Sequence, residues 1–290
     1  MDAIFDAIIE GFPRAYRNAQ AEHYVLWGLI GNNYQMMKTF PNQFTFCDMP
    51  YHGRLVGNSF ENSFWRWCYK SFHDSRKLNV PDDRFKKWNL ELKPYRDEGN
   101  FILICPSSET MTRTINGLTQ DRWIQTMYDK IKPNTKLPIR VRLKPRKNGT
   151  SGPAAETVSM KEELKGCHAL VTNASLTAIE ALSEGIPVFT DTSECPAAWC
   201  AERDFRKINN PELFEREELF HNLAYKQYSI EEIRQDFSAY ITDNCQFYDY
   251  YEQEAAREAM LTASTSDFEV EARWSSTPRS NKEIYEYSFR

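Results

Sequence analysis

The sequence predicts an α/β protein of two lobes, each built on a parallel sheet. Short apolar runs that suit strands alternate with segments whose apolar residues recur at helical spacing. Polar residues follow several of these runs directly, and ligands of open parallel sheets bind beside such strand ends. A chain of 290 residues is long enough for two domains. We expect a first lobe over 1–98, a second over 99–245, and a C-terminal helix with a partly ordered tail over 246–290.

The first lobe is expected to alternate helices and strands. Helices are predicted over 1–17 and 34–38, and strands over 22–30 and 43–47. Asp48 follows the second of these strands directly, at the edge where a catalytic base would face a ligand. Aspartate is also a common turn residue, so Asp48 has a structural interpretation as well.

The block from Asp48 to Phe72 is dense in polar and aromatic side chains and lacks clean periodicity. We therefore predict that it is rich in loops, and that the polar, charged segment 80–99 behind it is a linker or a rim. The aromatic side chains of the block suit two roles: stacking an acceptor molecule, or packing together under a long loop. The sequence does not choose between them.

The second lobe is predicted to open with a buried strand over 101–105, followed at its carboxyl end by Ser107 and Ser108. A helix over 120–131 and a strand over 138–143 come next. Arg140, Arg142, Lys144 and Arg146 lie on or just beyond that strand, and two interpretations stay open. Alternate residues of a strand share a face, so these cations form a solvated face or neutralise a diphosphate leaving group.

The stretch from Cys167 to Thr190 organises the second lobe. Its apolar runs at 168–172 and 186–189 predict two strands, and the segment between them has helical spacing from Ser175. Gly185 and Pro187 mark the end of that helix. A helix that starts there presents unpaired N–H groups, which commonly bind phosphate. Further helices are predicted over 159–165, 211–225, 230–241 and 249–261, the third with Ser229 and Glu232 as a capping box.

Composition restricts the classes of function. The net charge of −5 argues against tight nonspecific binding to nucleic acid. Seven cysteines occur singly, without a C-x-x-C pair, and five histidines lack zinc spacing, which is typical of a reducing compartment without structural zinc. No apolar run approaches the length of a membrane span. We expect a cytoplasmic protein that does not span a membrane, in the host cytoplasm if a phage encodes it.

Two motifs resemble a known family. The pattern V-T-N-A-S-x-x-A-x-E-A-L-x-x-G-I-P-V around residues 171–188 resembles the donor-site segment of GT-B glycosyltransferases of the capsule-polysaccharide-biosynthesis type and of related phage-encoded proteins. The phrase LAYKQYSIEEIR resembles the end of the same enzymes. The resemblance implies two Rossmann-like lobes with parallel sheets and a cleft between them. It covers 101–242 well and 22–72 weakly.

The resemblance also implies a division of labour among the residues. The donor would be a nucleotide sugar, UDP- or CMP-linked, bound without a metal or other cofactor, and no D-x-D pair is present to hold one. The family's K/R-P-H-P-like motif has Arg146 in place of its histidine. Asp48 would be the catalytic base. The donor-binding residues would be Ser107, Ser108, Arg142, Lys144, Arg146, Asn173, Ser175, Thr177 and Glu180; the acceptor-binding residues would be Tyr51, His52, Arg54, Trp65 and Arg66.

Three functions follow as alternatives. The first is a glycosyltransferase that modifies a hydroxymethylated base in phage DNA, with tryptophans stacking a flipped base. The second is a glycosyltransferase that acts on a glycan or small-molecule hydroxyl, which the pI of about 5.7 favours. The third is a noncatalytic nucleotide- or sugar-binding protein with the same fold. Turnover of any nucleotide sugar would separate the first two from the third.

Overall fold

The computed structural model of the protein describes residues 2–11, 23–29, 31–53, 63–74, 76–96, 98–144, 159–235, 270–275 and 284–289. The chain forms two compact units. Unit 1 comprises Met1–Asp74 and Leu223–Arg290, and unit 2 comprises Ser75–Asn222. The chain thus passes between units at Asp74 and at Asn222, whereas the sequence suggested boundaries at 98 and 245.

Unit 2 contains a five-stranded parallel sheet with the order β5-β4-β6-β7-β8. Its strands are β4 (Phe101–Ile104), β5 (Ile139–Val141), β6 (Cys167–Val171), β7 (Val188–Phe189) and β8 (Ala201–Glu202). All four residues of β4 are buried, as the uniformly apolar run predicts for a central parallel strand. The predicted α/β class and this parallel sheet are confirmed.

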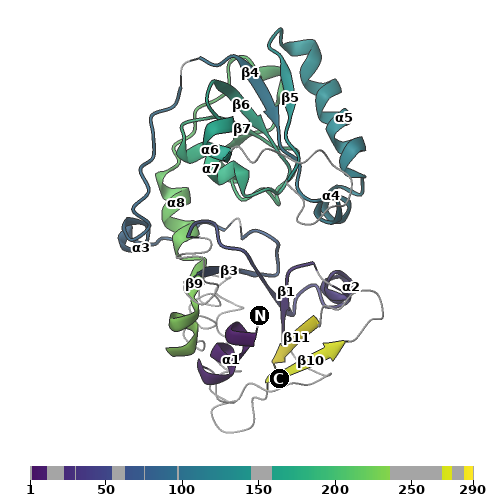
Figure 1. The fold of residues 1–290 in the computed structure, drawn as a ribbon, viewed down its shortest axis with the longest axis vertical. Helices are drawn as coiled ribbons and strands as arrows, with labels where there is room; N and C mark the ends of the chain where they lie inside the picture. The colour runs from purple at the N-terminus through teal and green to yellow at the C-terminus, as the bar shows by residue number, and fades with distance from the viewer. Residues whose placement is uncertain are drawn as a thin grey trace. The chain divides into compact units, whose positions relative to one another are not determined.

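Helices precede, connect and follow the strands of unit 2 (Figure 1). They are α3 (Asp83–Lys86), α4 (Glu109–Asn116), α5 (Gln120–Ile131), α6 (Met160–Glu163) and α7 (Thr177–Ser183), with α8 (Glu217–Ala224) near the return to unit 1. Three short 3-10 turns also occur, at Lys132–Asn134, Ala198–Cys200 and Phe205–Lys207. The range of α5 matches the prediction, whereas α4, whose sequence ETMTRTIN is mostly polar, was not predicted although Ser108 and Gly117 cap its two ends.

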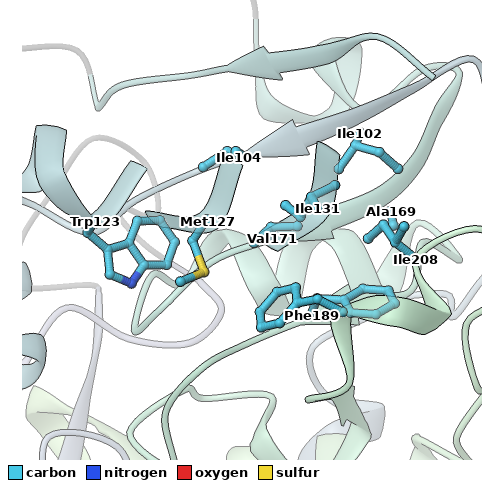
Figure 2. Close-up of a cluster of buried hydrophobic side chains, with 10 residues drawn as sticks. Ile102, Ile104, Trp123, Met127, Ile131, Ala169, Val171, Phe189 and Ile208 are labelled. Carbon is cyan, nitrogen blue, oxygen red and sulfur yellow. The ribbon is translucent and has the colours of Figure 1, made fainter. Parts of the chain in front are cut away.

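The core of unit 2 packs α5 onto the sheet (Figure 2). Trp123, Met127 and Ile131 occur at helical spacing and are fully buried. They lie against side chains from β4, β6 and β7, namely Ile102, Ile104, Ala169, Val171 and Phe189, with Ile208 and Phe205 completing the cluster. This packing holds the strand ends, and the loops that follow them, in fixed positions.

Gly185 ends α7 as the sequence predicts. Its φ of 76° lies in the left-handed region, which glycine adopts without a steric penalty. A Cβ at this position would overlap the carbonyl oxygen of Pro94. Two constraints, the backbone conformation and the close approach of residues 93–94, therefore require glycine here.

Unit 1 contains a six-stranded sheet with the order β10-β11-β1-β2-β3-β9. The strands are β1 (His23–Trp27), β2 (Phe44–Asp48), β3 (Phe64–Tyr69), β9 (Gln227–Ser229), β10 (Val270–Ser275) and β11 (Ile284–Phe289). Two helices, α1 (Asp2–Gly11) and α2 (Asn33–Thr39), belong to the same unit. Strands β10 and β11 lie in the range for which the sequence suggested a partly ordered tail.

The expectation of a parallel sheet in the first lobe holds only for β1 and β2, which α2 connects. Every other strand pair in this sheet is antiparallel. Parallel neighbours need a crossover connection, usually a helix. β3 was not predicted either: it is buried on both faces, so its sequence FWRWCY shows no alternation of apolar and polar residues.

The predicted capping box is present at the end of unit 1. Ser229 Oγ accepts a hydrogen bond from the Glu232 N–H at 3.1 Å, and Glu232 Oε2 accepts one from the Ser229 N–H at 2.7 Å. The helical residues 230–235 follow directly. The predicted helix over 249–261 lies outside the described residues.

Candidate functional site

The carboxyl ends of β4 and β6 form the point at which the sheet of unit 2 reverses its strand order. From β4 the chain moves out to β5 on one side, then returns to β6 on the other side of β4. In open parallel sheets the crevice at such a switch point is the usual ligand site. Ser107 and Asn173 follow these two strands, so the structure brings together two of the predicted donor-binding residues.

Asn173 is fully buried and joins the two strand ends. Its Oδ1 accepts hydrogen bonds from the N–H groups of Ser107 at 2.8 Å and Ala174 at 2.9 Å. Its Nδ2 donates to Thr112 Oγ1 at 3.2 Å and to Asn116 Oδ1 at 2.9 Å. An amide group has two donors and two acceptor sites, so its capacity is used. The side chain of Asn173 therefore positions the two loops, and its predicted role in donor binding stays a prediction.

Ser107 keeps one polar hydrogen for a ligand. Its Oγ accepts a hydrogen bond from the Ala174 N–H at 3.2 Å, and its carbonyl accepts bonds from Thr112 Oγ1 at 3.3 Å and Gln120 Nε2 at 2.6 Å. Among the described residues no acceptor is recorded for its hydroxyl hydrogen. A hydroxyl that already accepts one bond still donates one, so Ser107 is suited to contact an anionic oxygen.

Ser108 and Ser175 have local structural roles at the same edge. Ser108 is the N-cap of α4, since its Oγ accepts a hydrogen bond from the Met111 N–H at 3.3 Å. Ser175 Oγ accepts one from the Thr177 N–H at 3.3 Å, so α7 begins at Thr177 and not at Ser175. Thr177 Oγ1 is buried without a hydrogen-bond partner among the described residues. Glu180 is exposed on the first turn of α7.

Asp191 belongs to the same polar network, although the sequence analysis did not select it. Its Oδ2 accepts hydrogen bonds from Trp123 Nε1 at 2.9 Å and Asn116 Nδ2 at 3.2 Å. Through Asn116 it connects to Asn173. Asp191 follows β7 closely, so the rule that selected Ser107 also applies to it. We call Ser107, Thr112, Asn116, Gln120, Trp123, Asn173 and Asp191 the switch-point network.

A depression of about 430 Å³ lies beside Asp191. It is lined by residues after β7 and β8 together with one residue of α5: Lys130, Thr190, Asp191, Arg203, Asp204, Phe205 and Arg206. Arg206 is engaged there, with Nε 2.8 Å from Asp204 Oδ1 and Nη2 2.6 Å from Oδ2. These contacts from Arg206 lower the pKa of Asp204 to about 2. The depression thus extends the polar edge of the sheet away from the switch point.

The predicted basic residues on and after β5 differ in whether the protein itself engages their charges. The Arg140 guanidinium stacks on the Phe101 ring at 3.9 Å, and Arg142 Nη1 lies 3.1 Å from Glu163 Oε2. Both are therefore held by the protein itself. Lys144 is exposed, and no ion pair is recorded for it among the described residues. Arg146 lies outside the described residues. Of the predicted cations that the structure describes, Lys144 is best suited to meet a phosphate.

Asp48 in unit 1 already has donors on both carboxylate oxygens. Oδ1 accepts a hydrogen bond from the Met49 N–H at 2.7 Å, which is the turn interaction of the structural alternative. Oδ2 lies 3.1 Å from Arg66 Nη2, whose side chain is 3% exposed. Both carboxylate oxygens of Asp48 are therefore engaged within unit 1.

The other predicted acceptor-binding residues also lie largely in the core of unit 1. Trp65 is 1% exposed, and its ring lies 4.5 Å from that of Trp27, so it offers no exposed face for stacking. Tyr51 is buried with its hydroxyl 3.4 Å from Cys68 Sγ, and burial raises the pKa of that phenol well above its usual value. His52 is half-buried, and its backbone pairs with the Gln227 side chain. Arg54 lies outside the described residues.

Two searches of the described residues found nothing. No three His, Cys, Asp or Glu side chains there are grouped closely enough to hold a metal ion. No helix in the described part of the chain is both long and apolar enough to cross a membrane.

Comparisons with known proteins give a likeness to solved structures but not to a described family. No protein-family model matches the chain, and no curated protein matches it. Among solved structures, the chain is similar to the β-Kdo 2,4 transferase KpsC of Thermosulfurimonas dismutans. The two share 12% sequence identity with a TM-score of 0.42, over 72% of this chain and 86% of the other. At this level of similarity, the likeness does not assign an activity to this protein.

Proposed function

We propose that the protein transfers a sugar from a nucleotide-sugar donor to an acceptor hydroxyl. One observation carries the proposal: Ser107 and Asn173 meet at the switch point of the parallel sheet. The segment Cys167–Thr190, whose sequence resembles a glycosyltransferase donor site, supplies β6, α7 and β7 at this point. Sequence pattern and sheet topology thus indicate the same edge of unit 2, independently of each other.

The donor phosphates would bind at the carboxyl edge of the sheet. The Ser107 hydroxyl donates to a phosphate oxygen. The first N–H groups of α7 already bond to Ser175 and Leu176, so this helix contributes only the positive end of its dipole. Lys144 contributes positive charge, which stabilises the nucleotide as it departs with the bonding electron pair. Binding without a metal is part of the proposal, because these groups supply the charge compensation that a metal would otherwise provide.

In the transfer step, the bond between the anomeric carbon and the donor phosphate breaks, and a bond to the acceptor oxygen forms. The acceptor proton passes to a base. Asp48 is the proposed base, with His52 as the next candidate. The described residues provide no stacking surface at Trp65 that would favour a DNA base, so we propose a glycan or small-molecule hydroxyl as the acceptor.

The decisive experiment is a screen of UDP-, CMP-, GDP- and dTDP-linked sugars for nucleotide release, with and without a panel of acceptors. DNA that contains hydroxymethylated bases belongs in this panel beside glycans. Turnover of one donor supports the proposal. Binding of a donor without turnover, under every acceptor condition, would favour the noncatalytic alternative.

A matched pair of lysine variants tests the donor site. Lys144→Ala should weaken donor affinity by about 1.5–3 kcal/mol, the cost of one charge-assisted contact, without changing the unfolding midpoint. Lys136→Ala removes an exposed lysine from the opposite end of β5 and should leave the affinity unchanged. Titration calorimetry with the donor measures both. Equal affinities for the two variants would show that Lys144 belongs to a solvated face.

Chelation tests metal independence. Donor turnover should be the same in EDTA as in buffer without it, since Lys144, the Ser107 hydroxyl and the dipole of α7 compensate the charge. Loss of turnover in EDTA, restored by Mn²⁺ or Mg²⁺, would contradict this part of the proposal while leaving glycosyl transfer itself in place.

A further inference from the structure

Strand β5 is one edge of the parallel sheet in unit 2 (Figure 1). Within the described residues, β4 is the strand that pairs with it. Its inner side pairs with β4: the Ile102 N–H donates to the Pro138 carbonyl, and the Arg142 N–H donates to the Ile104 carbonyl, both at 2.9 Å. Backbone groups alternate in direction along a strand. The N–H and C=O groups of Ile139 and Val141 therefore face outward, where an added strand would pair with them.

The side chains beside this edge are unusually apolar for a surface. In the described part of the chain, four large hydrophobic side chains are exposed, and three of them lie on β5, just after it, or on the neighbouring helix α5. Val141 is 47% exposed, Leu143 is 50% exposed and Tyr128 is 37% exposed. Ile139 of β5 and Ile124 of α5 pack against the same core, so both elements border the same face of the sheet. An apolar flank thus borders an open strand edge.

The opposite face of the same strand is basic. Arg140 lies on this face of β5 with its guanidinium stacked on Phe101, and Arg142 and Lys144 follow the strand at alternate positions. Arg140 and Lys144 are exposed, on a chain whose net charge is −5. A second copy of the chain pairing with β5 in antiparallel fashion would bring arginines opposite arginines, which is destabilising. A strand with acidic side chains on one face and apolar side chains on the other would instead complement both faces.

We propose that the outer edge of β5 binds an extended segment of another protein in which acidic and apolar residues alternate. The segment would add a sixth strand to the sheet of unit 2 through the outward N–H and C=O groups of Ile139 and Val141. Its apolar side chains would cover Val141 and Leu143, and its carboxylates would lie over Arg140 and Lys144. Lys144 also belongs to the proposed donor site, so the tests below use Val141 and Arg140, to which that proposal gives no role, and need no nucleotide sugar. Failure of this interaction and failure of the proposed function are therefore distinguishable.

Hydrogen exchange of the full chain gives the first test. The Val141 amide should exchange fast in the free protein, whereas the Arg142 amide should be protected by its bond to Ile104. A blocked peptide of alternating glutamate and valine should slow exchange at Val141. The corresponding lysine–valine peptide should have little effect. A Val141 amide that is already protected in the free monomer would overturn the proposal, because the chain itself would then cover this edge.

Variants of Val141 provide the second test. Val141→Pro removes only the outward N–H, a change that edge strands tolerate, and should weaken binding of the acidic peptide about tenfold. Val141→Thr keeps the N–H and the branched shape, and should bind nearly as well as the wild type. Circular dichroism checks that both variants fold. If the proline variant misfolds, Arg140→Glu replaces it and should reverse the preference between the two peptides.

Analytical sedimentation tests whether a second copy of the chain binds the outer edge of β5 instead. The chain alone should remain monomeric at the concentrations used for peptide binding. A dimer that Val141→Pro converts to monomer would show that a second copy occupies the edge, and would overturn the proposal. Equal binding of the acidic and basic peptides would overturn it as well, because charge would then play no part in recognition.

Discussion

Unit 2 keeps charged side chains off its two central strands, whereas unit 1 buries charges on and beside its own. Strands β4 and β6 carry no Asp, Glu, Lys or Arg, and their polar partners Ser107 and Asn173 come after the strand ends. In unit 1, Arg66 lies on the buried strand β3. Lys226 packs beside it, with its carbonyl accepting from the Trp67 N–H. Lys226 and Asp74 form an ion pair whose side chains are each 1% exposed.

The difference shows where polar side chains indicate function. Beyond the carboxyl ends of parallel strands, the backbone has no neighbouring strand to hydrogen-bond with. Polar groups there face a crevice and are suited to bind a ligand. On a strand that is covered on both faces, a charge has to be paired within the protein to be tolerated. The dense block from Asp48 to Tyr69 resembles a site in composition, yet most of its described side chains are core.

Removing the cation of the buried pair should have the largest effect. Lys226 Nζ donates to the Asp74 carbonyl at 2.8 Å and lies 3.6 Å from Asp74 Oδ1. Lys226→Met leaves the Asp74 carboxylate buried without this counter-charge, so the free energy of unfolding should fall by about 3–5 kcal/mol. Chemical denaturation measures the loss. Lys77→Met is the control, because its ion pair with Glu218 is exposed, and should change stability by less than about 0.5 kcal/mol.

Asp48→Asn separates a structural role from a chemical one. The amide keeps an acceptor for the Met49 N–H but removes the charge facing the buried Arg66 guanidinium. We expect a loss of about 1–3 kcal/mol in the free energy of unfolding. Asp121→Asn, on the exposed side of α5, should cost little. If sugar transfer slows while the free energy of unfolding is unchanged, Asp48 acts as a base. The view that the charged side chains on the strands of unit 1 are structural would then not hold for Asp48.

Two threonine-to-valine changes sharpen the comparison within unit 2. Thr172 is fully buried, and its Oγ1 donates to the Cys105 carbonyl at 2.6 Å. Thr172→Val leaves that carbonyl without this donor and should cost about 1–2 kcal/mol. Thr177 Oγ1 has no partner among the described residues, so Thr177→Val should leave stability unchanged or raise it. Equal losses in thermal unfolding would contradict the hydrogen-bond assignment.

The smallest expected effect concerns Glu202 at the end of β8. Burial alone would raise the pKa of this carboxyl, but hydrogen bonds from the Asp204 N–H and from Lys207 outweigh it and lower the pKa below the usual 4.5. A lowered pKa in the folded state contributes stability above pH 4.5, and this contribution is lost as the pH falls through the folded-state value. Glu202→Gln should remove it, by less than about 1 kcal/mol. The exposed Glu212→Gln should leave the acid limb of the stability curve unchanged.

The sequence predicted the elements of unit 2 well because local signals there agree with the tertiary fold. Trp123, Met127 and Ile131 share a helical face and are buried together. Ser159 caps α6, accepting from the Glu162 N–H, and Gly185 ends α7. Such caps and periodicities act over a few residues, so they can be detected without knowledge of the fold.

Strand β3 and the sheet of unit 1 could not be predicted in the same way. The pairing of β3 with β2 and β9 joins residues far apart in the chain, and no local pattern records it. The missed helix α4 is mostly polar, but it has local signals: Ser108 is its N-cap, and Gly117 ends it in the left-handed conformation. Tertiary pairing therefore explains the missed strand, whereas the missed helix could have been found from its caps.

The candidate site likewise has features that local sequence determines and features that tertiary contacts determine. The sequence alone determined that polar residues follow the strands that end near Ser107 and Asn173, because strand ends and turn residues are local features. Only the tertiary structure decided that β6 lies beside β4 and that the Asn173 side-chain amide forms hydrogen bonds with the loops. It also decided that Asp191 and Trp123 belong to the switch-point network. It likewise decided that Trp65 and Arg66 are buried. Burial and strand order result from contacts between distant segments, which composition and spacing do not encode.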